Sequence, residues 1–230
     1  MKRAEKLYNR DYAQKYRLFD EYIKNSKYQK SLENFLIYYF NQTLKDLKKE
    51  KLDVLDLGCG TGRYFHIFNG ELINRFVGID ISQPMIEIAK NSPPFKEEIN
   101  IKNIELINDD FMKVKNIGKF DFIYSIGVLG EHVPFDQKII NKISNEFINK
   151  GGRFIFTTVC WWYRKKWKRL IHFLAEKLGI KYFLYEKGLL WGFYNSDYSI
   201  YKITSKDFDL EELKLWNKEY PHYLVCLRKY

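Results

Sequence analysis

The chain has 230 residues, of which 46% are hydrophobic and 30% are charged, and its formal net charge is +10 at pH 7. This length suits one globular domain with a sizeable core, and the hydrophobic content excludes a disordered chain. No apolar run is long enough to span a membrane, and the first residues lack the apolar stretch of a secretory signal.

The cysteines and the charge limit the chemistry and the location. Cys59, Cys160 and Cys226 are odd in number and far apart, which favours a reducing compartment over a disulfide framework or a zinc site. No histidine or acidic cluster has the spacing of metal ligands. We therefore expect a cytoplasmic protein without a metal ion. The positive charge fits either a lysine-rich solvated surface or an anionic partner, and composition alone favours the surface.

Residues 1–49 predict two helices that form an N-terminal cap. In the second helix, Leu32, Phe35, Leu36 and Tyr39 recur with the period of a helix that buries one face. The first helix has a looser apolar face and carries several tyrosines.

Residues 50–160 alternate between apolar strands and helical segments, which is typical of an α/β sheet. Strands are expected at about 52–57, 75–80, 101–107, 120–125 and 153–159. Helices are expected after Gly62, from Ser82 with Pro84 in the first turn, and over about 135–148. A turn is expected at 149–152.

The rest of the chain predicts an inserted lid at 160–204 and a closing hairpin at 205–230. The insertion is too long for a plain connection in the sheet. Trp167, Ile171, Leu174 and Leu178 share one face of a helix, and the nearby lysines lie mostly off that face. A helix is then expected near 205–211, followed by strands near 212–218 and 223–227 with a tight turn at 219–222.

The stretch 54–63 carries the most informative motif. Gly58, Gly60 and Gly62 follow a buried strand and remove every Cβ from one side of a tight turn, so that backbone can approach a nucleotide-like ligand. Arg63 stands where a dinucleotide fold has its third glycine, and no lysine follows to form a phosphate loop. The turn therefore predicts a ligand without a pyrophosphate.

Polar motifs follow the next three strands. Asp80 ends the second strand, where a carboxylate can accept hydrogen bonds from both hydroxyls of a ribose. Asp109 and Asp110 follow the third strand and precede Phe111. The fourth strand leads into the glycine-containing run at 125–133.

Taken together over residues 50–160, these motifs resemble those of the class I S-adenosylmethionine-dependent methyltransferases of the small-molecule type. The resemblance implies an α/β fold with a Rossmann-like, seven-stranded, mostly parallel sheet, helices on both faces and an antiparallel last strand. It also implies S-adenosylmethionine as the cofactor and S-adenosylhomocysteine as its product.

The resemblance assigns roles within a cofactor site. The methionine end would lie against the glycine turn, Asp80 would bind the ribose, and Ile81 would pack on the adenine. Asp110, which precedes Phe111, would bind the adenine amino group, with Asp109 as the second choice, although either acid could instead cap the next turn. Tyr12, with Tyr16, would line the pocket from the cap or instead pack the helix onto the core. The expected cofactor-binding residues are Asp56, Gly58, Gly60, Gly62, Asp80, Ile81, Met85, Asp109, Asp110, Phe111, Ser125, Ile126 and Tyr12.

A sulfonium is an activated methyl donor, so holding the acceptor near attack distance supplies most of the catalysis. A hydroxyl acceptor also benefits from a base. His132 is the first candidate, because it follows the fourth strand at the carboxyl edge of the sheet and imidazole titrates near neutral pH. Glu131 is the second candidate. His132 could instead bond nearby backbone or cap the next helix.

The acceptor is the least determined part. The run 127–135 is similar to methyltransferases of bacterial surface-sugar pathways, which favours O-methylation of a small anionic acceptor such as a nucleotide-linked sugar or a phosphorylated metabolite. Aromatic and cationic residues of the lid would suit such an acceptor. Alternatives are an RNA methyltransferase, a lipid or quinone methyltransferase that docks on a membrane through the basic amphipathic segment 162–178, and a cofactor-binding protein without chemistry.

Overall fold

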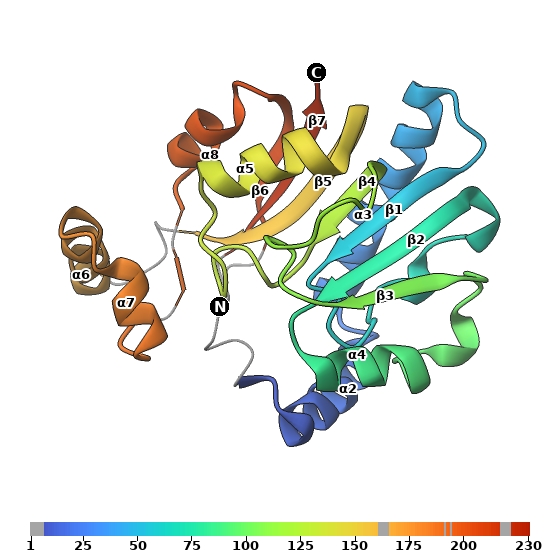
Figure 1. Ribbon diagram of the computed structural model, residues 1–230, viewed down its shortest axis with the longest axis horizontal. Helices are drawn as coiled ribbons and strands as arrows, with labels where there is room; N and C mark the ends of the chain where they lie inside the picture. Colours follow the sequence, from blue (N-terminus) through green and yellow to red (C-terminus); the bar gives the residue numbers. More distant parts are fainter. Residues whose placement is uncertain (1–6, 161–165, 191, 194, 217–221) are drawn as a thin grey trace.

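A computed structural model of the protein describes residues 7–160, 166–190, 192–193, 195–216 and 222–230, with the backbone alone at Lys166 and Lys168 (Figure 1). Part of the expected lid and most of the expected turn at 219–222 lie outside the described residues.

Seven strands form one sheet in the order β3-β2-β1-β4-β5-β7-β6 (Figure 1). The first five strands along the chain pair in parallel, and β7 runs antiparallel to both of its neighbours. The predicted mostly parallel sheet with an antiparallel last strand is thereby confirmed. The strands are β1 (Leu52–Leu57), β2 (Ile73–Asp80), β3 (Ile104–Asn108), β4 (Phe120–Ser125), β5 (Ile148–Val159), β6 (Phe208–Leu215) and β7 (His222–Lys229).

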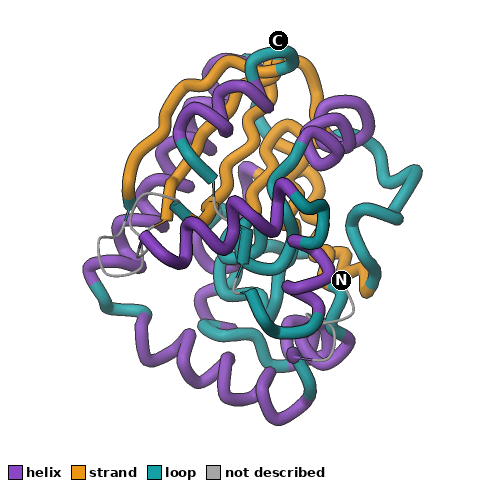
Figure 2. The backbone as a smooth tube through the Cα atoms, turned by 90° about the vertical axis from the view of Figure 1, so that its left-hand side faces the viewer, coloured by secondary structure: helices purple, strands orange, loops and turns teal. Residues whose placement is uncertain are grey.

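The two helices expected in residues 1–49 are present, and α4 begins after Ser82, whose hydroxyl accepts from the Met85 amide as the capping pattern predicts. In Figure 1, α6 and α7 lie to one side of the sheet, and Figure 2 views the molecule from that side with most strands in its upper part. The helices are α2 (Arg10–Ile23), α3 (Lys27–Leu47), α4 (Gln83–Asn91), α5 (Gln137–Lys142), α6 (Lys166–Lys177), α7 (Lys181–Glu186) and α8 (Asp197–Thr204).

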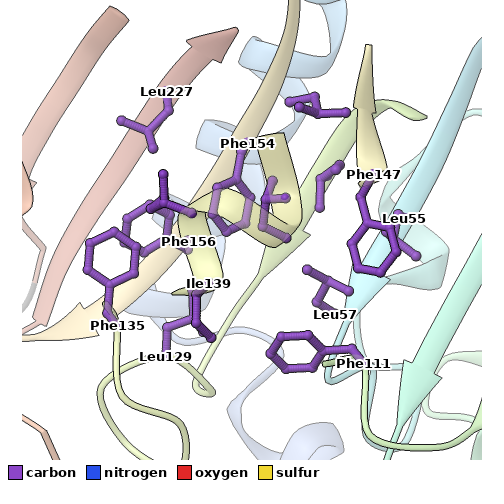
Figure 3. Packing of buried hydrophobic residues seen from close by; sticks show 14 of the residues in the cluster. Leu55, Leu57, Phe111, Leu129, Phe135, Ile139, Phe147, Phe154, Phe156 and Leu227 are labelled. Carbon is purple, nitrogen blue, oxygen red and sulfur yellow. The ribbon is translucent and has the colours of Figure 1, made fainter. Parts of the chain in front are cut away.

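Both faces of the sheet are buried, as a parallel sheet requires. On one face, Leu55 and Phe154 pack with Ile139 of α5 and with Phe147 (Figure 3). On the other face, Leu32 and other residues of α3 pack on the aromatic side chains of β2 and β4. The apolar period of residues 32–39 therefore marks a true core face.

The α-helix expected after Gly62 is absent, and a single 3-10 turn at Phe65–Ile67 takes its place. Tyr64, Phe65 and Phe68 are all buried from this turn. A second 3-10 turn, Gly70–Leu72, follows and leads into β2 at Ile73. The glycine turn therefore has no α-helix N-terminus behind it.

Two other boundaries differ from expectation. The helix expected at 135–148 ends at Lys142 and continues as a π-turn, and residues 149–152 form an irregular part of β5 opposite Asp121 instead of a turn. The helix expected near 205–211 is wrong, because residues 205–207 form a turn and residues 208–211 belong to a strand; helix α8 lies before this range and begins after Ser196, which forms a reciprocal cap with Ser199. β6 consequently starts at Phe208.

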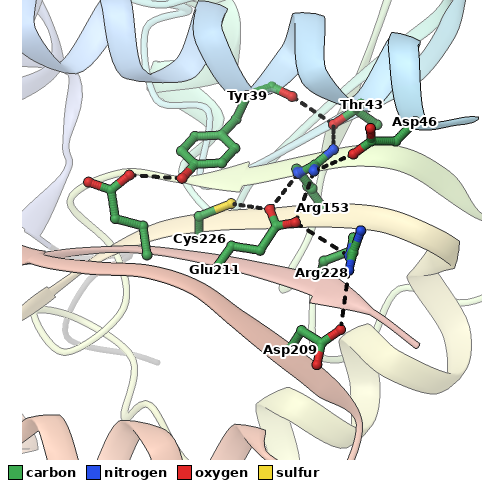
Figure 4. Close-up of polar contacts among 9 residues, drawn as sticks. Tyr39, Thr43, Asp46, Arg153, Asp209, Glu211, Cys226 and Arg228 are labelled. Atoms are coloured by element: carbon green, nitrogen blue, oxygen red, sulfur yellow. Dashed lines mark hydrogen bonds and ion pairs between the residues drawn. The ribbon is translucent and has the colours of Figure 1, made fainter.

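A buried arginine ties the cap to the far edge of the sheet (Figure 4). The Arg153 guanidinium in β5 donates to both oxygens of Glu211 in β6, at 2.6 and 2.9 Å, and to Asp46 of α3 at 2.6 Å. Such a two-point bond to a carboxylate fixes direction as well as distance. It holds α3 in place across the face of β5.

Candidate functional site

A cavity of about 580 Å³ lies at the carboxyl ends of β1, β2, β3 and β4. Ligands of open α/β sheets bind at this edge. The strand ends supply its floor, α2 and neighbouring cap residues supply one wall, and Trp216 and His222 close it from the antiparallel end of the sheet.

The glycine turn forms the floor. The amides of Gly58 and Cys59 both donate to the Ile79 carbonyl, so the turn is fixed to the end of β2. Gly58 and Gly60 line the cavity with φ of 80° and 55°, and a Cβ on Gly58 would lie 2.3 Å from a methyl carbon of Val128. Val128 therefore leaves no room for a side chain at the position of Gly58.

Asp80 lies beside this turn and holds it. One carboxylate oxygen accepts from the Gly60 amide at 2.9 Å and the other accepts from the Ser82 amide at 2.8 Å. Burial raises the pKa of Asp80, and the bonds from Ser82 and Gly60 oppose that rise. Each oxygen keeps a second lone pair that a ligand hydroxyl could use.

Asp56 of β1 also lines the cavity and is 2% exposed. Burial raises the pKa of its carboxyl well above the ordinary value for aspartate. A buried carboxyl beside a bare glycine turn suits a cationic group such as a ligand ammonium, which would stabilise its charged form.

The residues expected around an adenine come together along one wall. Ile81, Met85, Phe111 and both acids after β3 line the cavity. Asp109 accepts from the Asp110 amide at 2.7 Å, and Asp110 accepts from the Met112 amide at 2.9 Å. Both acids thus brace the turn, as the alternative interpretation proposed, and each keeps a second oxygen.

Three of the expected residues are not part of the cavity lining. Gly62 packs its backbone against Phe65, which a Cβ would strike at 2.5 Å. The Ser125 hydroxyl is buried and donates to the Leu57 carbonyl at 2.8 Å, whereas the neighbouring Ile126 does line the cavity. Tyr12 is 38% exposed, and Tyr8 and Tyr16 line the cavity from the cap instead.

Arg63 joins the glycine turn to the cap through a buried ion pair that the sequence interpretation missed. Its guanidinium pairs with Asp20 of α2, whose other oxygen accepts from the Thr61 hydroxyl at 2.6 Å. The Tyr16 ring lies 5.2 Å from the guanidinium carbon. The arginine in place of a third glycine was the available signal, but α2 offers several carboxylates and nothing in its sequence selects Asp20.

His132 connects three parts of the chain. Its Nε2 lies 2.6 Å from the Tyr8 hydroxyl of the cap, and its Nδ1 lies 3.3 Å from the Tyr185 hydroxyl of α7. Burial raises the pKa of Tyr8, so this phenol stays neutral and remains able to donate. His132 therefore bonds side chains from two distant segments of the chain.

Glu131 forms a second pair in the cavity with His222, which was not among the expected site residues. The Glu131 carboxylate lies 2.9 Å from His222 Nε2, and both residues line the cavity. His222 begins β7 and pairs with Val159 of β5, and this sheet pairing brings it to the site. A carboxylate bonded to one ring nitrogen fixes the orientation of an imidazole.

The described residues of the segment expected as a lid reach the site at its edge. Tyr185 contacts His132, and the Phe193 amide donates to the Gly130 carbonyl at 2.5 Å. No described residue of 160–204 lines the cavity. Within the described ranges, no group of three histidine, cysteine or acidic residues is arranged to hold a metal ion, and no helix is both long and apolar enough to cross a membrane.

A family model described as a methyltransferase domain matches residues 48–218. A ubiquinone biosynthesis O-methyltransferase of Dictyostelium discoideum is 26% identical over 143 residues, covering 59% of this chain and 42% of that protein. A carboxy-S-adenosyl-L-methionine synthase of Helicobacter pylori is 28% identical over 140 residues, covering 58% and 55%. The chain thus spans about half the length of the curated relatives it matches.

Solved structures cover nearly the whole chain. The magnesium protoporphyrin IX methyltransferase of Synechocystis, with bound S-adenosylhomocysteine, gives a TM-score of 0.60 at 16% identity and covers 99% of this chain and 98% of that one. A S-adenosylmethionine-dependent methyltransferase of Clostridium acetobutylicum gives a TM-score of 0.63 at 16% identity and covers 95% and 99%. At this identity the likeness is one of fold.

Proposed function

Because the chain belongs to the class I S-adenosylmethionine-dependent methyltransferases, we propose that it methylates a hydroxyl group on a small, largely apolar and aromatic acceptor. The observation that carries this proposal is the wall of the cavity opposite the glycine turn. Aromatic residues of the cap form it together with Trp216, the residue after β6, and Tyr28 stacks on the indole of Trp216 with ring centroids 3.8 Å apart. Aromatic walls bind flat rings by offset or edge contacts.

The charges in the cavity favour this acceptor over the anionic one that the sequence suggested. Arg63 is the single lysine or arginine among the described lining residues, and its charge is already matched by Asp20. Asp80 and Glu131 add negative charge to the same cavity. A phosphorylated acceptor would therefore meet more carboxylates than free cations.

S-Adenosylmethionine supplies the activated methyl group when it is bound. We place its methionine end against Gly58 and Gly60 near Asp56, its ribose on Asp80, and its adenine between Ile81 and Phe111. The bare turn, the remaining lone pairs of Asp80 and the apolar wall support this placement. The acceptor then occupies the space below the cap tyrosines, next to His132.

We propose that His132 removes the proton from the acceptor hydroxyl. Glu131, the second candidate base, then fixes the orientation of His222 through the bond between them. The Tyr8 hydroxyl lies 2.6 Å from Nε2 of His132, and an acceptor hydroxyl would take its place as the donor to the single lone pair of this nitrogen. Proton transfer of this kind contributes about 10²- to 10⁴-fold to rate. The cap and the aromatic wall position the acceptor and keep water out.

The proposal can be tested by incubating the protein with methyl-tritiated S-adenosylmethionine and three acceptors: a catechol or hydroquinone, a nucleotide-linked sugar and bulk tRNA. We expect label on the phenolic compound, with a mass gain of one methyl group. Label on the sugar or the RNA would overturn the assignment. Mass analysis of the cofactor in the same reaction separates methyl transfer from a reaction like that named for the Helicobacter relative, in which the cofactor itself would be altered.

The roles of the two histidines give a second prediction. With the phenolic acceptor, His132→Gln should lower kcat about 100-fold or more with little change in cofactor affinity, since it removes a base and keeps a similar shape. His222→Gln should have a smaller effect on kcat. Full turnover of His132→Gln together with loss of turnover in His222→Gln would assign the base to the Glu131–His222 pair instead.

The cytoplasmic location stays a prediction. Cys59, Cys160 and Cys226 are free and buried in the structure, which fits the reducing compartment on which that prediction rests.

A further inference from the structure

The apolar side chains of helix α6 are exposed, whereas a helix that packs on its own domain turns such side chains toward the core. Trp167, Leu170, Ile171 and Leu174 recur at helical spacing, and they are 58%, 57%, 42% and 48% exposed. His172 and Ala175, which lie on the neighbouring side of the helix, are each 2% exposed. The helix therefore faces the protein with its small and polar side and faces outward with its apolar side.

This stripe of apolar residues remains exposed on the described part of the protein. A small cluster that includes Ala175, Tyr185 and Phe193 holds α6 and α7 together, and in Figure 1 both helices lie to one side of the sheet, away from its main body. Leu178, which follows α6, and Phe183 of α7 are also exposed, at 69% and 59%. Several large apolar side chains exposed on two neighbouring helices mark an interaction site.

The charges around the stripe identify the partner. Between Lys166 and Lys187 the sequence has six lysine or arginine residues and two glutamates. One of the glutamates, Glu176, is already paired with Lys181 at 3.0 Å. A second copy of this chain would bring an equally positive face to the contact, since the formal net charge is +10. An anionic lipid surface would attract the cations and accept the apolar side chains.

We propose that α6, together with the start of α7, docks on an anionic membrane surface with the Trp167–Leu174 stripe inserted at the level of the lipid headgroups. The helix then lies in the plane of the membrane and does not cross it. Tyr185 of α7 contacts His132, so the docked surface lies next to the cavity wall. The docking does not depend on the proposed acceptor, although it would bring the cavity close to an acceptor dissolved in lipid.

The test is flotation of the full chain with vesicles of phosphatidylcholine alone or of phosphatidylcholine with phosphatidylglycerol, without cofactor or acceptor. We expect binding to the anionic vesicles that weakens with salt. Leu170→Gln/Leu174→Gln should reduce that binding roughly tenfold or more, because two exposed apolar side chains no longer enter the interface. These residues are exposed and lie outside the cavity, so the variant should fold and should keep its turnover of a water-soluble acceptor.

The matched control is Leu18→Gln/Tyr201→Gln, which changes two apolar residues that are 59% and 58% exposed on other helices. This control should bind vesicles like the original chain. Absence of co-flotation with anionic vesicles would overturn the proposal. Equal vesicle binding by the stripe variant and the control would also overturn it. So would a protein that binds no lipid but forms a concentration-dependent dimer that the stripe variant abolishes. Each of these outcomes would leave the proposed methyl transfer intact.

Discussion

Asp80→Ala is expected to weaken the binding of S-adenosylmethionine by at least about 100-fold, because it removes two roles at once. The carboxylate is placed to accept two hydroxyls of the ribose, and a hydrogen bond to a charged group contributes about 1.5–3 kcal/mol. It also accepts from the amides of Gly60 and Ser82, which fixes the glycine turn. Isothermal titration calorimetry with the cofactor measures the loss directly.

The control is Asp53→Ala, which removes a carboxylate from the opposite end of β1, where it accepts from the Asn74 side chain at 2.7 Å. This variant should bind the cofactor normally. Burial raises the pKa of Asp80, and the ribose requires the ionised form. Affinity should therefore be constant above this raised pKa and fall as the pH drops through it, beginning at a higher pH than for an ordinary aspartate. Equal cofactor affinity in Asp80→Ala and Asp53→Ala would contradict the assigned role.

Asp20→Ala is expected to lower the free energy of unfolding by about 3–5 kcal/mol, the range observed when one partner of a buried ion pair is removed. The Asp20 side chain is fully buried, and that of Arg63 is 14% exposed. The substitution leaves the guanidinium without its carboxylate and removes the acceptor of the Thr61 hydroxyl. Urea unfolding, monitored by tryptophan fluorescence, measures the change.

Two further variants distinguish loss of the buried ion pair from a general destabilisation of α2. Glu21→Ala removes the neighbouring carboxylate, whose pair with Arg17 lies at the surface, and should cost less than about 1 kcal/mol. Asp20→Ala/Arg63→Met should recover much of the loss, because no buried charge remains unpaired. A single Asp20→Ala variant as stable as Glu21→Ala would show that the cap is not held by this pair.

The same variant has a functional consequence. Tyr8 and Tyr16 belong to the cap and line the cavity, and Asp20 and Thr61 link this cap to the glycine turn. Loosening the link should therefore also weaken cofactor binding in Asp20→Ala at temperatures where the domain is still folded. The helical cap thus contributes to the site through a charge pair as well as through its aromatic side chains.

Local sequence pattern determined the sheet and the floor of the site. Apolar runs at 52–57 and 120–125 coincide with β1 and β4, because a strand buried on both faces reads as a continuous apolar run. The alternate glycines and Asp80 were identifiable because the residues that form a turn at a strand end are neighbours in the chain. The helix expected after Gly62 was wrong, since the aromatic residues at 64, 65 and 68 have helical spacing but are buried from a short 3-10 turn.

Only the tertiary structure decided which distant side chains meet. Arg63 could be read as a missing glycine, yet its partner Asp20 lies 43 positions away on a helix with several other carboxylates. His222 comes to Glu131 because β7 inserts between β5 and β6, a pairing of segments far apart in the chain. The apolar stripe of α6 was visible in the sequence, but its outward direction was not, because amphipathic periodicity gives the width of a face and not what the face meets.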